Sequence, residues 1–324
     1  MWQVRVNDSQ IHNSFRFADD ILFSYISTDN SHALGIDNSG RLWAWGRNNI
    51  GQLGDGTTTH RDYPVLISSN QYLAVSAGGE FSAAIRADGS IWTWGNNVVG
   101  QLGVPLTIGH RRSPARLDTG LNTFTAVSAG FNHTLAIDSD GGLWGWGNNW
   151  GSQLASSSTD SVLPSRIMQA RQFSQILAVG SSSFAICGDD TLWAWGNNPN
   201  GILGVGSASS TISSPTIVDM GTVLWRPAIS ASASGGHVLA TPNSSVSVFS
   251  WGDNWYMQLG NGSYDSANTP QQIFGNITDS LLDIFALNNS SFMIRRHSRG
   301  THYVYHWGRN GAATPQIIFS HTPN

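Results

Sequence analysis

A Trp-Gly pair recurs six times along this chain, about every fifty residues, and it constrains the fold more than any other feature. The tryptophans of the six pairs are Trp45, Trp94, Trp146, Trp195, Trp251 and Trp307. A period of about fifty residues is typical of a four-stranded propeller blade and is too long for paired-helix repeats. No stretch keeps the period of an amphipathic helix for more than a few residues. The repeat therefore predicts an all-β chain.

The third unit shows how each repeat divides into four strands. Short apolar runs at Phe124–Ala129, His133–Ile137 and Leu143–Trp146 predict the first three strands. The second and third strands are joined by Asp138–Gly142, whose Asp-Gly pair is a strong hairpin signal. We expect the fourth, outer strand to follow Pro164, because an edge strand tolerates proline at its start. The corresponding prolines of the six units are Pro64, Pro114, Pro164, Pro215, Pro270 and Pro315.

Six repeats predict a six-bladed β-propeller over residues 21–319, flanked by an N-terminal arm or extra strand (1–20) and a short tail (320–324). The expected blades are residues 21–67, 68–117, 118–168, 169–218, 219–274 and 275–319. Pairing of the C-terminal strand with the first blade would close the ring and remove two open sheet edges. The alternative is a seventh blade built partly from residues 1–20.

Composition narrows the classes of function. Among 324 residues only 11% are charged, and the formal net charge of −4 argues against a sequence-independent nucleic-acid binder. All 16 basic residues are arginines, which fits a virion component or an injected effector, with sequence drift as the alternative. Cys187 is the single cysteine, so an intrachain disulfide is excluded.

The sequence shows no signal peptide, and its apolar runs fall well short of the roughly 20 residues of a membrane span. We therefore expect no membrane insertion, and a protein that is virion-associated, injected or cytoplasmic.

The repeat resembles that of the regulator-of-chromosome-condensation family. The resemblance rests on Ser128–Ile137 with Asp140–Leu154 and on Asp88–Gly103, and it extends over about residues 21–319. Members of that family are β-propellers, usually with seven blades. They include exchange factors for the small GTPase Ran, ultraviolet-B photoreceptors, β-lactamase inhibitors and secreted effectors. The resemblance implies a broad surface that binds another protein.

Two tryptophans depart from the repeat. Trp150 and Trp255 lie four residues after the tryptophan of a Trp-Gly pair, in a loop where the blade core needs no large ring. Exposed tryptophan is enriched at binding hot spots, and Tyr256 follows Trp255 directly. The alternative is a ring folded over its own loop as a lid.

Loops before the outer strands carry a second candidate group, formed by Arg61, His110, Arg111 and Arg112. They come from neighbouring blades, so they are expected to form a basic patch. Arginine grips carboxylates or phosphates with a bidentate fork. The alternative is an ordinary solvated loop.

Histidines recur near the start of the second strand in alternate units, at His32, His133 and His237. Three imidazoles can ligate a metal. However, the family motif carries a histidine here that usually ties down a turn by a hydrogen bond. We therefore predict no metal site and no cofactor. Signatures of hydrolases, metalloproteases and phosphate-binding loops are missing, so we also predict no catalytic residues.

These observations predict a non-catalytic platform that binds a protein or glycan partner through loops on one propeller face, as an adhesin, a virion appendage or a secreted effector. One alternative is a guanine-nucleotide exchange factor for a small GTPase. The other is a propeller hydrolase or lyase with a funnel site.

Overall fold

The chain is all-β and forms the six blades of a β-propeller, which confirms the predicted fold class. A computed structural model describes residues 4–5, 14–16, 21–29, 31–120, 122–156, 160–219, 225–231, 236–242, 247–275, 280–297 and 300–322. The chain divides into two compact units, which are described separately below. The first comprises Met1–Trp150 and Ser158–Ala178, and the second comprises Gly151–Ser157 and Val179–Asn324.

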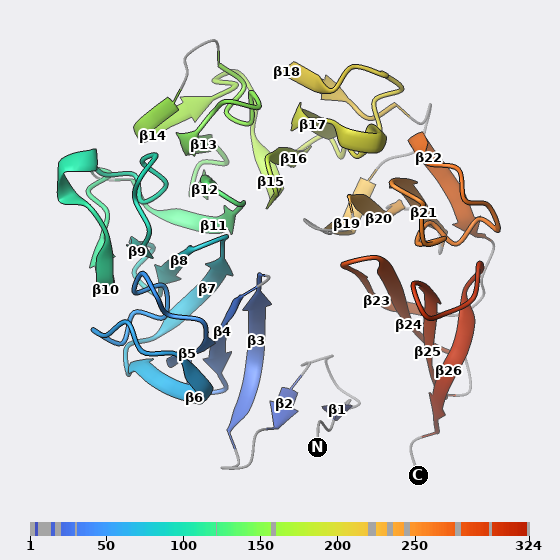
Figure 1. Cartoon of the computed structure of the whole chain (residues 1–324), viewed down its shortest axis with the longest axis horizontal. Helices are drawn as coiled ribbons and strands as arrows, with labels where there is room; N and C mark the ends of the chain where they lie inside the picture. Colours follow the sequence, from blue (N-terminus) through green and yellow to red (C-terminus); the bar gives the residue numbers. More distant parts are fainter. Residues whose placement is uncertain are drawn as a thin grey trace. The chain divides into compact units, whose positions relative to one another are not determined.

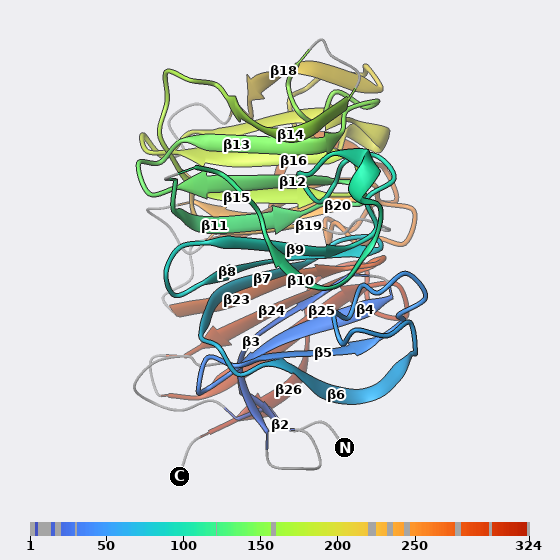
Figure 2. The ribbon, with the colours of Figure 1, turned by 90° about the vertical axis from the view of Figure 1, so that its left-hand side faces the viewer.

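The first unit holds three complete blades, whose strands follow one another in sequence order within each sheet (Figures 1 and 2). Blade one contains β1 (Val4–Arg5), β2 (Ser14–Arg16), β3 (Leu22–Thr28), β4 (His32–Asp37), β5 (Leu42–Gly46) and β6 (Arg61–Ser68). Blade two contains β7 (Tyr72–Ala77), β8 (Phe81–Arg86), β9 (Ile91–Gly95) and β10 (Arg111–Arg116), with the 3₁₀ helix η1 (Leu106–Ile108) before β10. Blade three contains β11 (Phe124–Ala129), β12 (His133–Asp138), β13 (Leu143–Asn148) and β14 (Asp160–Ile167).

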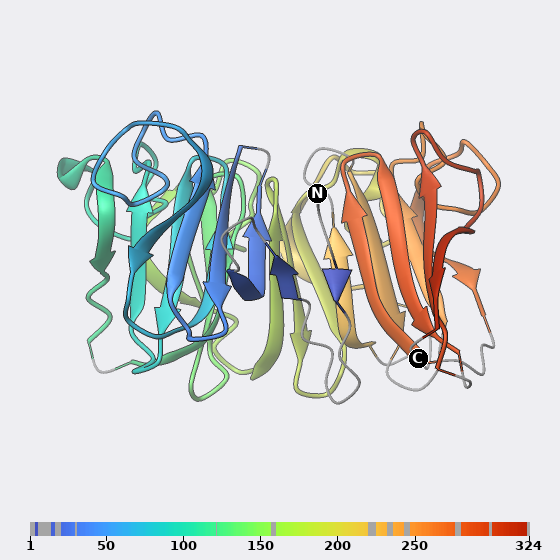
Figure 3. The same ribbon diagram turned by 90° about the horizontal axis from the view of Figure 1, so that it is seen from below.

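The remaining three blades have the same strand order. Blade four contains β15 (Phe173–Val179), β16 (Ser182–Cys187), β17 (Leu192–Asn197) and β18 (Thr211–Ile217), with η2 (Pro199–Gly201) before β18. The unit boundary falls within β15. Blade five contains β19 (Trp225–Ala231), β20 (His237–Pro242), β21 (Val248–Gly252) and β22 (Ala267–Phe274). Blade six contains β23 (Ser280–Leu287), β24 (Ser290–Arg296), β25 (His302–Gly308) and β26 (Gln316–His321), which run side by side in Figure 3.

Neighbouring blades within a unit are joined by the repeat tryptophans. The indole Nε1 of Trp94 donates to the carbonyl of Gln52 in the preceding blade at 2.9 Å, and Trp146 donates likewise to Gln101 at 3.0 Å. Trp307 repeats the contact in the second unit, at 2.9 Å from the carbonyl of Gln258. These rings are fully buried, so each combines a large apolar area with a satisfied polar atom. The repeat therefore encodes the contact between blades as well as the blade itself.

Proline has a precise place in the fourth strands. In blade one, Arg61 pairs with Gly46 and Val65 pairs with Ala44. Between these two pairs the chain advances four residues along β6 but only two along β5. Pro64 lies in this bulge, where the strand needs no amide donor from it. The same irregularity surrounds Pro114, Pro164, Pro215 and Pro270. Fourth strands in blades one to five therefore begin three or four residues before the proline, earlier than the sequence predicted.

The predicted closure of the ring is wrong in its strand pairing. β26 pairs with β25 of its own blade, with Val304 opposite Phe319, and blade one has its own fourth strand, β6. Each fourth strand pairs with the third strand just before it in the chain, because antiparallel neighbours in sequence pair most readily. Residues 4–5 and 14–16 form β1 and β2, which extend the sheet of blade one beyond β3. The domain bounds, and the 320–324 tail whose last two residues lie outside the described ones, remain predictions.

Candidate binding loops

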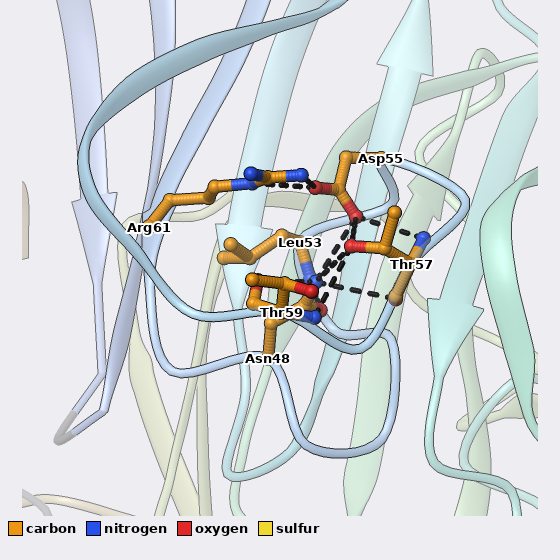
Figure 4. Close-up of polar contacts among 6 residues, drawn as sticks. All are labelled: Asn48, Leu53, Asp55, Thr57, Thr59 and Arg61. Atoms are coloured by element: carbon orange, nitrogen blue, oxygen red, sulfur yellow. Dashed lines mark hydrogen bonds and ion pairs between the residues drawn. The ribbon is translucent and has the colours of Figure 1, made fainter.

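In blades one, two, four and five, the loop between the third and fourth strands is built around one buried asparagine. In blade one, Asn48 Oδ1 accepts from the backbone N–H of Leu53 at 3.0 Å (Figure 4). Its Nδ2 faces the carbonyl oxygens of Thr57 and Thr59 and the carboxylate of Asp55, at 3.0 to 3.2 Å. Asn97, Asn198 and Asn254 hold their loops in the same way. A single side chain thus satisfies several backbone groups and fixes the loop.

Arg61 is engaged inside its own loop. Its guanidinium contacts Asp55 Oδ2 through Nη2 at 2.6 Å and Nε at 2.8 Å (Figure 4). Burial acts to raise the pKa of the Asp55 carboxyl, but hydrogen bonds from Thr57, Arg61 and Asn48 together lower it. Arg61 is therefore half-buried against a carboxylate instead of presenting a free fork.

The other members of the predicted basic group have different surroundings. Arg112 lies against Gly51 of the blade-one loop, and its carbonyl accepts from Gly56 N–H at 2.9 Å. This contact brings Arg112 to the blade-one loop that precedes Arg61. His110 is exposed and turns back to its own blade, where its Nδ1 accepts from the N–H of Asn97 at 3.4 Å.

Arg111 is half-buried, and its Nη1 atom is buried without a hydrogen-bond partner among the described residues. Burial lowers the pKa of its guanidinium. Arg61 is thus paired with Asp55, and Arg111 is partly buried. Arg112 is the one arginine of the group that is both exposed and close to the blade-one loop.

Trp150 is the most exposed of the three predicted aromatic site residues, Trp150, Trp255 and Tyr256, with 79% of its surface accessible. It follows β13 in blade three, and its N–H donates to Asn148 Oδ1 at 3.3 Å. The lid arrangement considered from the sequence would have buried the ring, so this exposure argues against it. Burying an indole against a partner removes a large apolar area from water.

Trp255 and Tyr256 lie in the loop of blade five, in the second unit. Trp255 is 75% exposed and Tyr256 is 45% exposed. Asn254 anchors the loop through Leu259, Asn261, Ser263 and Asp265, at 2.8 to 3.1 Å. Gln258 accepts from the Tyr256 N–H at 2.8 Å, so the backbone beneath both rings is fixed. Rigid exposed aromatic side chains lose little conformational entropy on binding.

Two residues near this loop escaped the sequence-based prediction. The guanidinium carbon of Arg309, from blade six, lies 5.2 Å from the ring centre of Tyr256. Tyr264, further along the blade-five loop, is also exposed. Arg309 directly follows a Trp-Gly pair, as Arg47 does in the first unit, and that signal was available. We call Trp255, Tyr256 and Arg309 the blade-five aromatic patch.

Two of the three recurrent histidines, His32 and His237, tie neighbouring blades together. His32 Nε2 lies 2.8 Å from Ser82 Oγ of the next blade, and Ser82 donates to the Gln52 carbonyl at 2.7 Å. His237 and Ser291 repeat the contact at 2.8 Å in the second unit. Across the described residues, no group of three His, Cys, Asp or Glu side chains is placed to hold a metal.

Comparison with known proteins gives the family. A model of the RCC1-like domain matches residues 10–314. The chain belongs to the RCC1-like domain family. Prp20p of Saccharomyces cerevisiae, which binds Gsp1p and histones, superposes with a TM-score of 0.76 at 18% identity, over 93% of this chain and 77% of that chain. Human WBSCR16 gives a TM-score of 0.69 at 22% identity, over 81% and 69%. These likenesses show the fold.

Among curated proteins, mouse E3 ubiquitin-protein ligase HERC2 is 28% identical over 73% of this chain but only 5% of its own length. The Arabidopsis thaliana ultraviolet-B receptor UVR8 is 30% identical over 44% of this chain and 33% of its own. The matched part is thus a small share of such relatives. Among the described residues, no helix is long and apolar enough to cross a membrane.

Proposed function

We propose that this RCC1-like domain is a non-catalytic module that binds a protein partner through its exposed aromatic loops. The observation that carries the proposal is the exposure of Trp255 and Trp150, at 75% and 79%, on loops held from beneath by buried side chains. Tryptophan and tyrosine dominate the energy of protein interfaces, and arginine joins them there. The blade-five aromatic patch combines all three residue types.

A protein partner fits this patch better than a glycan or a nucleic acid. The cation–π contact of Arg309 with Tyr256 provides a fixed positive charge beside an apolar surface, which suits a carboxylate next to an apolar side chain. The net charge of −4 disfavours a polyanion as the general ligand. Binding of Gsp1p and histones by Prp20p, a structural neighbour, supports the same class of partner.

The partner can be found by immobilising the full chain and presenting nucleotide-free small GTPases, histones and a glycan array. The variant is Trp255→Ala with Tyr256→Ala, and the matched control is Tyr63→Ala, an equally exposed aromatic residue of β6. We expect a protein to bind the wild type and the control and to be lost from the double variant. Recognition of glycans alone, or binding that survives in the double variant and in Trp150→Ala, would overturn the proposal.

The same experiment separates the proposal from guanine-nucleotide exchange. Each GTPase that binds is loaded with a fluorescent nucleotide, and its release is followed with and without the chain. Binding without faster release identifies a recognition module, whereas catalysed release identifies an exchange factor. The roles of adhesin, virion appendage and secreted effector differ in where such a binding module acts.

A further inference from the structure

Blades one and two each place an arginine at the same point of the fourth strand. Arg61 of β6 lies opposite Gly46, and Arg111 of β10 lies opposite Gly95. Each of these glycines belongs to the Trp-Gly pair of its blade. The residues at this point in blades three to five are Ser161, Ile212 and Ala267. The two arginines are therefore structural equivalents, and their surroundings can be compared directly.

In blade one, the loop supplies a carboxylate for its arginine. Asn48 anchors the N–H of Leu53, and Asp55 follows two residues later. The Asp55 carboxylate accepts from Arg61 Nη2 at 2.6 Å and from Nε at 2.8 Å (Figure 4). This two-point contact is the fork geometry in which arginine binds carboxylates best.

Blade two has the arginine but not the carboxylate. Asn97 anchors the N–H of Leu102 at 3.2 Å, and the residue two positions later is Val104, which is buried in the hydrophobic core. The residues at this loop position in blades three to five are Ser156, Val205 and Asn261. None of them is acidic, and those blades have no arginine at the paired point of the fourth strand. Among blades one to five, only blade two therefore has the arginine without the acid.

The surroundings of Arg111 leave its charge uncompensated. Its side chain is half-buried, its Nη1 atom is buried without a hydrogen-bond partner, and no ion pair involves it in the part of the chain that the structure describes. A guanidinium keeps its proton at neutral pH, so it cannot escape this cost by becoming neutral. A partly desolvated charge also attracts an anion more strongly than a fully hydrated one does.

We propose that Arg111 binds the carboxylate of an aspartate or glutamate side chain of a protein partner, as Arg61 binds Asp55 within blade one. The site is separate from the blade-five aromatic patch, and only the assignment of the carboxylate to a protein rests on the proposed function. The loop before Arg111 exposes half of the surface of Leu106 and of Ile108. Such apolar side chains suit a peptide segment that carries the acidic residue.

A single carboxylate fits this arginine better than a phosphate group does. The basic neighbours in sequence are engaged elsewhere, because His110 accepts from the Asn97 N–H and Arg112 lies against Gly51 of blade one. A phosphate group carries up to two negative charges and three acceptor oxygens, which one guanidinium does not satisfy. One carboxylate matches one guanidinium in both charge and geometry.

Nuclear magnetic resonance of the full chain with ¹⁵N-labelled arginine tests the site with sodium acetate as the probe, at constant ionic strength. The side-chain Nε–H signals are assigned through bonds from the backbone, so no variant is needed. We expect the Arg111 signal to shift saturably, with a dissociation constant at least about tenfold lower than that at the exposed Arg112. Arg61 is the matched control and should not respond, because Asp55 already occupies its fork.

The same titration with inorganic phosphate separates the two anions. Tighter binding of phosphate than of acetate at Arg111 would overturn the choice of carboxylate. An Arg111 signal that does not move, or that follows acetate no more tightly than the Arg112 signal, would overturn the site itself. These results require no partner, so they are independent of the proposed function.

Binding of the partner protein tests the assignment to an acidic side chain. We expect Arg111→Met to weaken that binding by more than about tenfold, whereas Arg112→Met should change it little. A partner that is lost from the Trp255→Ala, Tyr256→Ala double variant but binds Arg111→Met as it binds the wild type would contradict this inference and leave the proposed function standing.

Discussion

At the scale of single residues, the buried histidines make stability depend on pH. Burial lowers the pKa of His32 to about 4 and that of His133 to about 3. His32 also contacts Ser82, which fixes the neutral ring between two blades. The unfolded chain binds a proton at the ordinary pKa of about 6.5, so stability is fully present above that value. It is lost as pH falls from there through the folded-state pKa.

We predict that the free energy of unfolding falls between pH 7 and pH 4, with up to about 3 kcal/mol of the fall due to His32. Urea unfolding of the wild type and of His32→Gln at several pH values measures this. Glutamine does not titrate, so the variant should lose less stability over the interval. Equal slopes for the two proteins would show that His32 titrates normally when folded.

The two half-buried arginines of the basic group should respond oppositely to substitution. Arg61 pairs with Asp55, whereas Arg111 has a buried Nη1 atom without a hydrogen-bond partner among the described residues. We predict that Arg61→Met lowers the free energy of unfolding by about 1 to 2 kcal/mol, because it leaves the Asp55 carboxylate uncompensated. Arg111→Met should leave it unchanged or raise it slightly, because a poorly paired charge is replaced by an apolar chain.

Chemical denaturation of the two variants provides the comparison. A greater loss in Arg111→Met than in Arg61→Met would mean that Arg111 contributes more to stability than its described contacts indicate.

At the scale of elements, a buried asparagine gives the blade-five loop its shape. Asn254 makes four hydrogen bonds beneath Trp255 and Tyr256. We predict that Asn254→Ala lowers the free energy of unfolding by about 2 to 4 kcal/mol, because it leaves buried backbone groups unsatisfied. Asn261→Ala removes one of these bonds at an exposed site and should cost under about 1 kcal/mol.

Differential scanning calorimetry measures the stability of both variants. Similar unfolding temperatures for Asn254→Ala and Asn261→Ala would contradict the asparagine's role.

A glycine within the blade-four loop permits the close contact with blade five. A Cβ at Gly204 would lie 2.6 Å from Trp251 Nε1, the indole that donates to Ile202. Gly206 has nearly the same positive φ, but the nearest atom to a Cβ there would be Thr269 Cγ2, at 3.5 Å. We predict that Gly204→Ala costs at least about 2 kcal/mol more than Gly206→Ala, because both share the backbone strain and only the first displaces the indole.

Thermal unfolding followed by tryptophan fluorescence compares the two alanine variants. Equal destabilisation would mean that backbone conformation alone, and not the contact with Trp251, requires glycine at position 204.

The sequence repeat predicted the blades, but it did not predict the contacts of individual loop residues. Phe124–Ala129 was predicted as a strand from its short apolar run and is β11, because this signal is local in the sequence. β14 begins at Asp160 rather than after Pro164, since the sequence does not reveal the bulge. The contact between Arg309 and Tyr256 joins residues more than fifty positions apart. Such a contact depends on how two blades pack, which periodicity does not describe.

At the scale of the whole molecule, the two exposed tryptophans belong to different compact units. Trp150 is the last residue of the Met1–Trp150 stretch of the first unit, and Trp255 lies within the second unit. Each loop is anchored by side chains of its own blade, so we treat them as two separate binding elements. If a partner contacts both loops, Trp150→Ala and Trp255→Ala should each weaken its binding, and their effects should add. If it contacts one loop, only the substitution in that loop should weaken binding.

The most direct measurement is the affinity of the partner protein for the wild type, Trp255→Ala, Trp150→Ala and the control Tyr63→Ala, by isothermal titration calorimetry. Our account predicts that at least one tryptophan variant loses roughly 30-fold or more in affinity, as expected for a hot spot worth about 2 kcal/mol. The control should bind as the wild type does. Affinities within about threefold of the wild type for both tryptophan variants would contradict the account.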